Sequence, residues 1–175
     1  MVTLPESMRS TTGGLSQPHR LTEQQRLFSG IAKTVFLLNG QALAIAEDLA
    51  GPVGLTAAWW QVLATVLREP LSVADISRRV GTSRQSVQRV ADRLVGDGLA
   101  EYQPNPAHRR AKLLTPTDDG RSAVRAIAPA HAELAHQLAI QFGEEKLSRL
   151  LDNLQELSAA LDKLPPLDRP RSDPN

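Results

Sequence analysis

Two short helical segments that meet in a tight turn constrain this chain more than any other feature of its sequence. Ser72, followed by Asp75 three residues later, resembles a capping box and predicts a short helix that ends at Gly81. Ser83 predicts the cap of a second helix that runs to about Val95. Two helices joined this closely are typical of a helix-turn-helix unit.

A β-hairpin is predicted directly after this pair of helices. From Gly98 onward the apolar residues recur with period two, which predicts one strand over residues 99–103 and another over residues 111–115. Pro104 and Pro106 prevent the intervening loop from continuing either strand. We therefore expect the loop to project as a wing.

Longer helices are predicted on both sides of this region. An apolar stripe with alternating spacings of three and four residues predicts a long first helix that ends at Gly51, and Thr56 caps a further helix that ends before Pro70. Thr117 caps a helix after the hairpin, and a leucine stripe predicts a last helix after Gly143. The predicted fold is mainly α, a winged helix-turn-helix with the order α-α-α-α-β-β-α-α.

The first and last helices carry apolar seams that one small winged domain does not cover. They predict a homodimer held together by the terminal helices, since exposed seams of this length usually mark an interface. A monomeric bundle in which these helices cover one another is the alternative. We thus expect a helical dimerisation domain (residues 21–54 and 117–164), a winged helix-turn-helix domain (55–116), and disordered polar tails (1–20 and 165–175).

The composition excludes several kinds of chemistry. The 175 residues include no cysteine, which removes disulfides, thiolate metal sites and cysteine nucleophiles, and the four histidines form no set with metal-ligand spacing. The sequence contains no glycine-rich phosphate loop and no Gly-x-Ser-x-Gly elbow. The N-terminus has neither a signal-peptide pattern nor an apolar run of about 18 residues. We therefore expect a cytoplasmic protein that is not an enzyme and needs no metal or cofactor.

Positive charge is concentrated between Ser77 and Lys112. This stretch holds eight Arg or Lys residues against the three acids Asp92, Asp97 and Glu101, a net charge of +5. The whole chain has a net charge of +1, which leaves −4 for the remainder. A basic segment inside an otherwise acidic chain is expected where phosphates are bound. By charge alone, a solvated arginine-rich helix face fits equally well.

The helix that begins at Ser83 carries side chains suited to contacting DNA bases. Its apolar residues recur on one face and are predicted to point to the core: Val87, Val90, Ala91 and Leu94. The opposite face consists almost entirely of hydrogen-bond donors, and Arg pairs bidentately with guanine and Gln with adenine in the major groove. We assign Arg84, Gln85, Ser86 and Gln88 to bases, and Arg89 and Arg93 to phosphates.

The predicted wing adds a second basic element. Its loop contains His108, Arg109 and Arg110, and an arginine in this position can enter a minor groove narrowed by A·T pairs. Ser83 and Lys112 complete the predicted DNA-binding set. A winged-helix module that binds protein and not DNA is the alternative, and it predicts an acidic or apolar outer helix face, which this sequence does not have.

These segments make the chain resemble the MarR (multiple antibiotic resistance regulator) family of transcription factors from about Leu21 to Leu164. The resemblance rests on the stretches LTAAWWQVLATVL, SVADISRRVGTSRQSVQRVADRLVGDGLAEY and NPAHRRAKLLTPTDDG. Arg110, Lys112-Leu113 and Thr117 with Gly120 match the usual wing pattern of the family. His108 stands where the family usually has Asp, and Pro116 replaces a usual apolar residue.

The resemblance implies a homodimer with interlocked terminal helices that binds a pseudo-palindromic operator, its two recognition helices lying in major grooves about 34 Å apart. It also implies repression relieved by a small, often aromatic, ligand. Trp59, Trp60 and His131 are the candidates for that ligand site. Adjacent tryptophans point about 100° apart on a helix, so we expect at most one of them to line a cleft. The plainer interpretation is that both tryptophans are core residues and His131 packs in an interface.

Overall fold

The structure is a computed structural model that describes residues 21–108 and 111–165. The tail of residues 1–20, residues 166–175 of the second tail, and the wing arginines Arg109 and Arg110 lie outside the described residues. The chain divides into two compact units, Met1–Leu43 and Ala44–Asn175, and the whole winged region belongs to the second.

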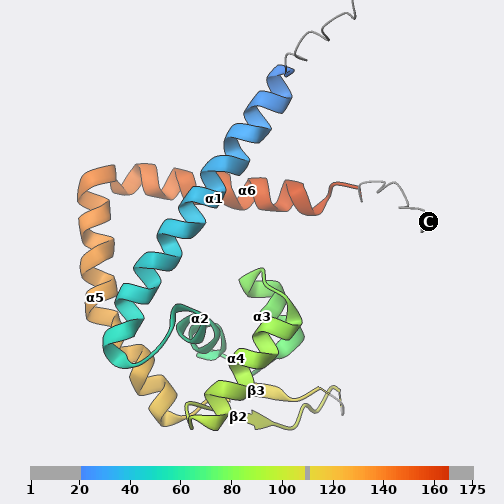
Figure 1. Cartoon of the computed structure of the whole chain (residues 1–175), viewed down its shortest axis with the longest axis vertical. Coiled ribbons are helices and arrows are strands. Elements are labelled where there is room, and N and C mark those ends of the chain that lie inside the picture. Colours follow the sequence, from blue (N-terminus) through green and yellow to red (C-terminus); the bar gives the residue numbers. More distant parts are fainter. Residues whose placement is uncertain (1–20, 109–110, 166–175) are drawn as a thin grey trace, which may run out of the picture. The chain divides into compact units, whose positions relative to one another are not determined.

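The described residues form six α-helices, one short 3-10 helix and a three-stranded sheet (Figure 1). The predicted order of helices and hairpin is confirmed, with two added elements, η1 and β1. In chain order the elements are α1 (Glu23–Ala50), η1 (Gly51–Val53), α2 (Ala57–Val66), β1 (Leu71–Ser72), α3 (Val73–Val80), α4 (Arg84–Gly96), β2 (Ala100–Gln103), β3 (Leu113–Pro116), α5 (Asp118–Phe142) and α6 (Glu144–Asp162).

Side-chain caps fix where four of the helices begin, and all four were predicted from the sequence. In each, a hydroxyl oxygen accepts the backbone N–H of the residue three positions later, at 3.1–3.2 Å. A cap of this kind contributes about 1 kcal/mol to helix stability. The capping residues are Thr56 for α2, Ser72 for α3, Ser83 for α4 and Thr117 for α5.

The first helix is unusually apolar. By length and composition alone, the stretch Glu23–Val53 is the one helix of the described residues that could cross a membrane, and helices of soluble proteins pass the same test. Many of its large apolar side chains are exposed, including Phe28 (59%) and Phe36 (77%). An interface with another protein surface accounts for this exposure as well as a bilayer does.

The sheet is antiparallel with the strand order β1-β3-β2. Leu114 of β3 is paired with Leu71 of β1 on one side and with Tyr102 of β2 on the other. The sequence did not predict β1, because a strand of two residues leaves no periodic pattern. The predicted second strand, 111–115, is corrected to Leu113–Pro116, since the pairing of Pro116 with Ala100 carries the strand beyond Thr115.

One hydrophobic core joins the helix-turn-helix, the sheet and the first part of α5. Its largest fully buried side chains are Leu63, Val66, Ile76, Val87, Leu94, Leu114 and Ile127. Burying a side chain of this size contributes about 1.5–3 kcal/mol. The predicted core face of α4 is confirmed, because Val87, Ala91 and Leu94 are at most 1% exposed and Val90 packs beside them. This packing fixes which face of α4 meets solvent.

The beginning of α5 is held to the segment between α4 and β2 by hydrogen bonds to two backbone carbonyls. The Thr117 backbone N–H donates to the Leu99 carbonyl at 3.1 Å, and the Thr117 hydroxyl donates to the Gly98 carbonyl at 2.7 Å. Gly120, one turn later, lies so close that an added Cβ would be 2.0 Å from the Leu99 carbonyl oxygen. Only glycine fits at this position without movement of the backbone.

We expect Gly120→Ala to lower the free energy of unfolding by about 1–3 kcal/mol, the usual cost of overpacking, because its methyl group meets the Leu99 carbonyl. Urea denaturation followed by circular dichroism measures this change. Gly96→Ala is the matched control, since a Cβ at this α4 position meets nothing within 4 Å. If Gly120→Ala were as stable as wild type, the close approach would be contradicted.

Candidate nucleic-acid interface

The two short helices form a helix-turn-helix with the wing beside it. Gly81 ends α3 in the left-handed region, at φ 69°, which allows the chain to turn sharply into Ser83 and α4. Figure 1 shows α3 and α4 packed against each other, with β2 and β3 extending from the end of α4, as their contacts require. The arrangement places one helix face and one hairpin next to each other.

The polar face of α4 is open to solvent. Arg84, Gln85 and Arg89 are exposed, and none of them forms an ion pair with another described residue. Arg93 is exposed too, but its Nε donates to Asp97 Oδ2 at 3.1 Å. The first turn and the middle of α4 therefore present unpaired positive charge and an amide group to any approaching ligand.

The two serines at the start of α4 use part of their hydrogen-bonding capacity on each other. The Ser83 hydroxyl accepts from the Ser86 backbone N–H and donates to the Ser86 hydroxyl at 2.9 Å. Ser86 is also half-buried, whereas its neighbours Arg84 and Gln85 are exposed. Arg84 and Gln85 are thus more accessible to a DNA base than Ser86 is.

Gln88, the remaining residue assigned to bases, is hydrogen-bonded to Asp92 and Tyr102, two residues for which the sequence predicted no role in binding. The Gln88 amide nitrogen donates to Asp92 Oδ1 and to the Tyr102 hydroxyl, each at 2.8 Å. The Tyr102 hydroxyl donates to the same Asp92 oxygen at 2.8 Å. Lys112 Nζ lies 5.7 Å from the centre of the Tyr102 ring, within cation–π range. The spacing of Gln88 and Asp92 was visible in the sequence, but their bond to β2 was not.

The environment of Tyr102 changes its acidity. Its pKa is raised from 10.0 to about 12, first by burial and then by the hydrogen bond to Asp92 and the negative charge of that carboxylate. The Tyr102 hydroxyl therefore remains protonated, and able to donate to Asp92, throughout the neutral range.

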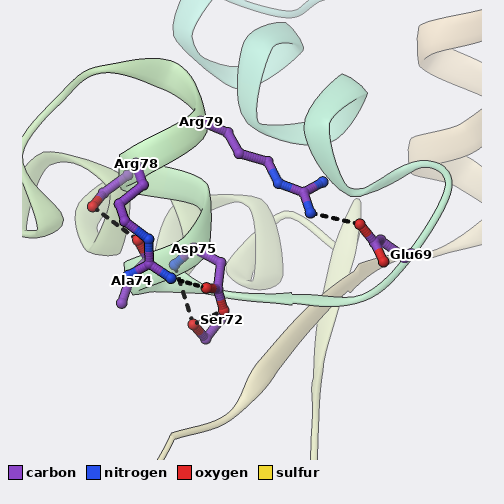
Figure 2. A network of polar contacts seen from close by, with 7 residues as sticks. Glu69, Ser72, Ala74, Asp75, Arg78 and Arg79 are labelled. Carbon is purple, nitrogen blue, oxygen red and sulfur yellow. Dashed lines mark hydrogen bonds and ion pairs between the residues drawn. The ribbon is translucent and has the colours of Figure 1, made fainter. Parts of the chain in front are cut away.

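The arginines of α3 are already engaged with acids (Figure 2). Arg78 pairs with Asp75, and Arg79 Nη2 lies 2.6 Å from Glu69 Oε1. The Ser72 hydroxyl donates to Asp75 Oδ2 at 2.5 Å, and this bond is the largest cause that lowers the pKa of Asp75. Among the described residues, the cations of the basic segment that form no ion pair are therefore Arg84, Arg89 and Lys112.

The concave side of this region is a shallow hollow of about 660 Å³ between the beginning of α3, α4 and the wing. Its lining includes Val73, Arg84, Gln85, Tyr102 and Lys112. Four of the predicted DNA-binding residues therefore border one surface, although Lys112 is far from the other three in sequence: Arg84, Gln85, Gln88 and Lys112.

The described part of the wing ends in a turn around His108. The His108 backbone N–H donates to the Asn105 carbonyl at 3.3 Å, and the His108 carbonyl accepts from Ala111 at 3.0 Å. The His108 side chain is exposed, as is Lys112. Since Arg109 and Arg110 lie outside the described residues, their predicted minor-groove contact stays a prediction.

The structure brings two of the three candidate ligand residues together. The rings of Trp60 on α2 and His131 on α5 meet edge to face, with centroids 5.7 Å apart and planes at 79°. Trp59 and Trp60 are both half-buried and pack against the core. Among residues 21–108 and 111–165, no three acidic or histidine side chains are grouped to hold a metal ion.

Comparisons with known proteins find one family and two relatives that this chain is similar to. Residues 53–111 match the MarR family. An uncharacterised protein of Mycobacterium tuberculosis is 39% identical over 127 residues, which cover 73% of this chain and 89% of that protein. BadR of Rhodopseudomonas palustris, named a transcriptional activatory protein, is 28% identical over 119 residues, covering 66% of this chain and 67% of BadR.

The fold has been seen before in a DNA complex. A mutant MarR from Escherichia coli, solved in complex with operator DNA, matches this chain with a TM-score of 0.67 and 19% identity. The match covers 78% of this chain and 99% of that one. Identity this low supports a shared fold, and the fold is that of a winged helix-turn-helix protein.

Tyr102 is the only tyrosine in the chain, so the absorbance of its phenolate reports on this one group. The raised pKa of Tyr102 means that its contribution to stability is complete below about pH 10 and is lost as the pH rises through 12. We expect Asp92→Asn to move the midpoint of phenol ionisation in the folded protein part of the way back toward 10. Glu101→Gln, which removes a carboxylate not bonded to Tyr102, should leave it unchanged. A wild-type midpoint at 10 would contradict the bond to Asp92.

Proposed function

Because this chain belongs to the MarR family of transcription regulators, which are not enzymes, we propose that it binds a pseudo-palindromic DNA operator as a homodimer. The observation that carries this proposal is the outer face of α4, where Arg84, Gln85 and Arg89 are exposed and form no ion pair with another described residue. The opposite face of α4 is buried in the core, so these three side chains are the ones that a DNA groove would contact.

Recognition divides between bases and backbone. Arg84 and Gln85, at the N-terminal end of α4, reach deepest into the major groove, where guanidinium and amide groups match guanine and adenine edges. Arg89 and Arg93 bind phosphates on the flanks, and Arg93 can exchange its exposed partner Asp97 for a phosphate at little cost. Lys112 and the wing loop bind the backbone and the adjacent minor groove.

The homodimer is supported by apolar side chains that are exposed in the single chain. They lie on the three long helices and are at least 37% exposed. A two-fold interface is the commonest way to cover such a surface, and it would set two copies of α4 on successive turns of the duplex. The residues include Phe28, Ile31, Val35, Leu38 and Ile45 on α1, Leu134 and Leu138 on α5, and Leu150, Leu154 and Leu161 on α6.

Regulation follows from occupancy of the operator. We infer repression in the cytoplasm, by blocking of polymerase, relieved by an aromatic effector that binds near Trp60 and His131 and changes the spacing of the two copies of α4. Because BadR is named a transcriptional activatory protein, repression and activation must be distinguished by experiment. Expression from a reporter gene behind the operator should rise when this protein is absent. If an effector released the protein from DNA without changing its tryptophan fluorescence, the effector site would not lie near Trp60.

Selection of bound sequences from random duplexes should yield an inverted repeat. With that operator, Gln85→Ala is expected to relax the preference at one base pair of each half-site by about 1–3 kcal/mol, because one bidentate contact is lost. Competition between the operator and its single-base-pair variants measures the change. Gln61→Ala, an exposed glutamine on α2, is the matched control and should leave every preference intact.

A purified protein that binds no duplex at low ionic strength would favour the protein-binding alternative. An affinity for duplex DNA that stays constant between about 50 and 200 mM salt would contradict the phosphate contacts, because such contacts release counterions and must weaken as salt rises.

Substitutions on α1 test the proposed dimer. The purified protein should have a mass of about twice 19.0 kDa by sedimentation, and Ile31→Glu should shift it toward the monomer by placing a charge in the apolar stripe. Lys33→Glu puts the same carboxylate on the other side of α1 and should keep the dimer. If Ile31→Glu remained dimeric, α1 would not form the interface.

A further inference from the structure

The amide nitrogen of Gln88 is held by two side chains of the protein. Asp92 can only accept hydrogen bonds as a carboxylate, so the amide nitrogen of Gln88 must face it, and the same nitrogen donates to Tyr102. The amide nitrogen is therefore bonded to two oxygen atoms of the protein. The Tyr102 hydroxyl closes the set by donating to Asp92 at 2.8 Å.

These bonds compete with a bidentate contact between Gln88 and adenine. Such a contact needs one amide hydrogen for the base nitrogen and the amide oxygen for the base amino group. In Gln88 the nitrogen that would supply this hydrogen is already bonded to Asp92 and Tyr102. Gln85 lies one turn earlier on the same exposed face, and its amide is not engaged with another described residue in this way.

The same three residues connect separate parts of the interface. Gln88 and Asp92 stand one turn apart on α4, whereas Tyr102 lies on β2, the first strand of the wing. The face of the Tyr102 ring carries Lys112, which leads into β3. The hydrogen-bonded set therefore joins the helix to both strands of the wing through one aromatic side chain.

We propose that Gln88 and Tyr102 are positioning residues that hold the wing in place relative to α4 through Asp92, and that Gln88 does not select a base. The inference rests on the proposed DNA-binding function. It predicts that loss of either residue weakens binding to all duplexes by the same factor, because the wing and Lys112 are then less well placed for the backbone.

The test compares Gln88→Ala, Tyr102→Phe and the double variant with wild type. We expect each single variant to lose about two- to tenfold in affinity, for the selected operator and for an unrelated duplex alike, with the selected sequence unchanged. Tyr102→Phe keeps the ring under Lys112 and removes only the hydroxyl. The double variant should lose less than the product of the two single losses, because both act through one set of bonds.

Gln85→Ala is the matched comparison, since it should alter the base preference where Gln88→Ala does not. If Gln88→Ala relaxed the preference at one base pair, or if the two single losses multiplied fully, the inference would be overturned.

A measurement without DNA separates this inference from the proposed function. Gln88→Ala should speed amide hydrogen exchange in β2 and β3 while exchange in α2, which lies in the core, stays at the wild-type rate. Faster exchange in the wing of a protein that binds no duplex would refute the proposed function and keep the positioning role. Unchanged exchange in the wing would refute the positioning role.

Discussion

The burial of one face of α4 is the interaction on which the DNA-facing surface depends. Val87, Ala91 and Leu94 are at most 1% exposed, and they meet core side chains from α2, α3 and the sheet. Once these three residues are buried, α4 cannot rotate about its own axis without a large loss of apolar contact. The outward direction of Arg84 and Gln85 is therefore a consequence of packing on the far side of the helix.

Charge is distributed less evenly than the sequence suggests. The basic segment includes the arginines of α3, yet Arg78 and Arg79 each face an acid. Exposed pairs of this kind contribute about 0–1 kcal/mol to stability, but they cancel charge locally and reduce attraction for phosphate. The attraction is concentrated on α4 and the wing, where Arg84, Arg89 and Lys112 form no ion pair with another described residue.

Features set by neighbouring residues could be predicted from the sequence. The caps at Thr56, Ser72, Ser83 and Thr117 depend on a hydroxyl and on an N–H three residues later, so their spacing alone identified them. The inward and outward faces of α4 followed from helical periodicity in the same way. The prediction that the first helix ends at Gly51 missed η1, because a single 3-10 turn leaves no periodic signal.

Features that depend on distant segments could not be predicted. The strand β1 exists only because Leu71 lies opposite Leu114, more than forty residues away along the chain. The bonds of Gln88 needed the position of Tyr102 relative to α4, which the hairpin register determines. A residue pattern specifies what a helix face offers, and the tertiary fold decides which of those groups are already in use.

The hydrogen bonds at the start of α5 have a mechanical consequence. Thr117 is bonded to the carbonyls of Gly98 and Leu99, and Gly120 lies against the Leu99 carbonyl, so the first turn of α5 is held to the segment between α4 and β2. The helix has 25 residues and extends about 37 Å from that attachment. A change in the direction of its first turn would therefore be passed to α4 and β2 together. Pro129 has no backbone N–H, so one bond of the helical ladder is missing partway along this helix.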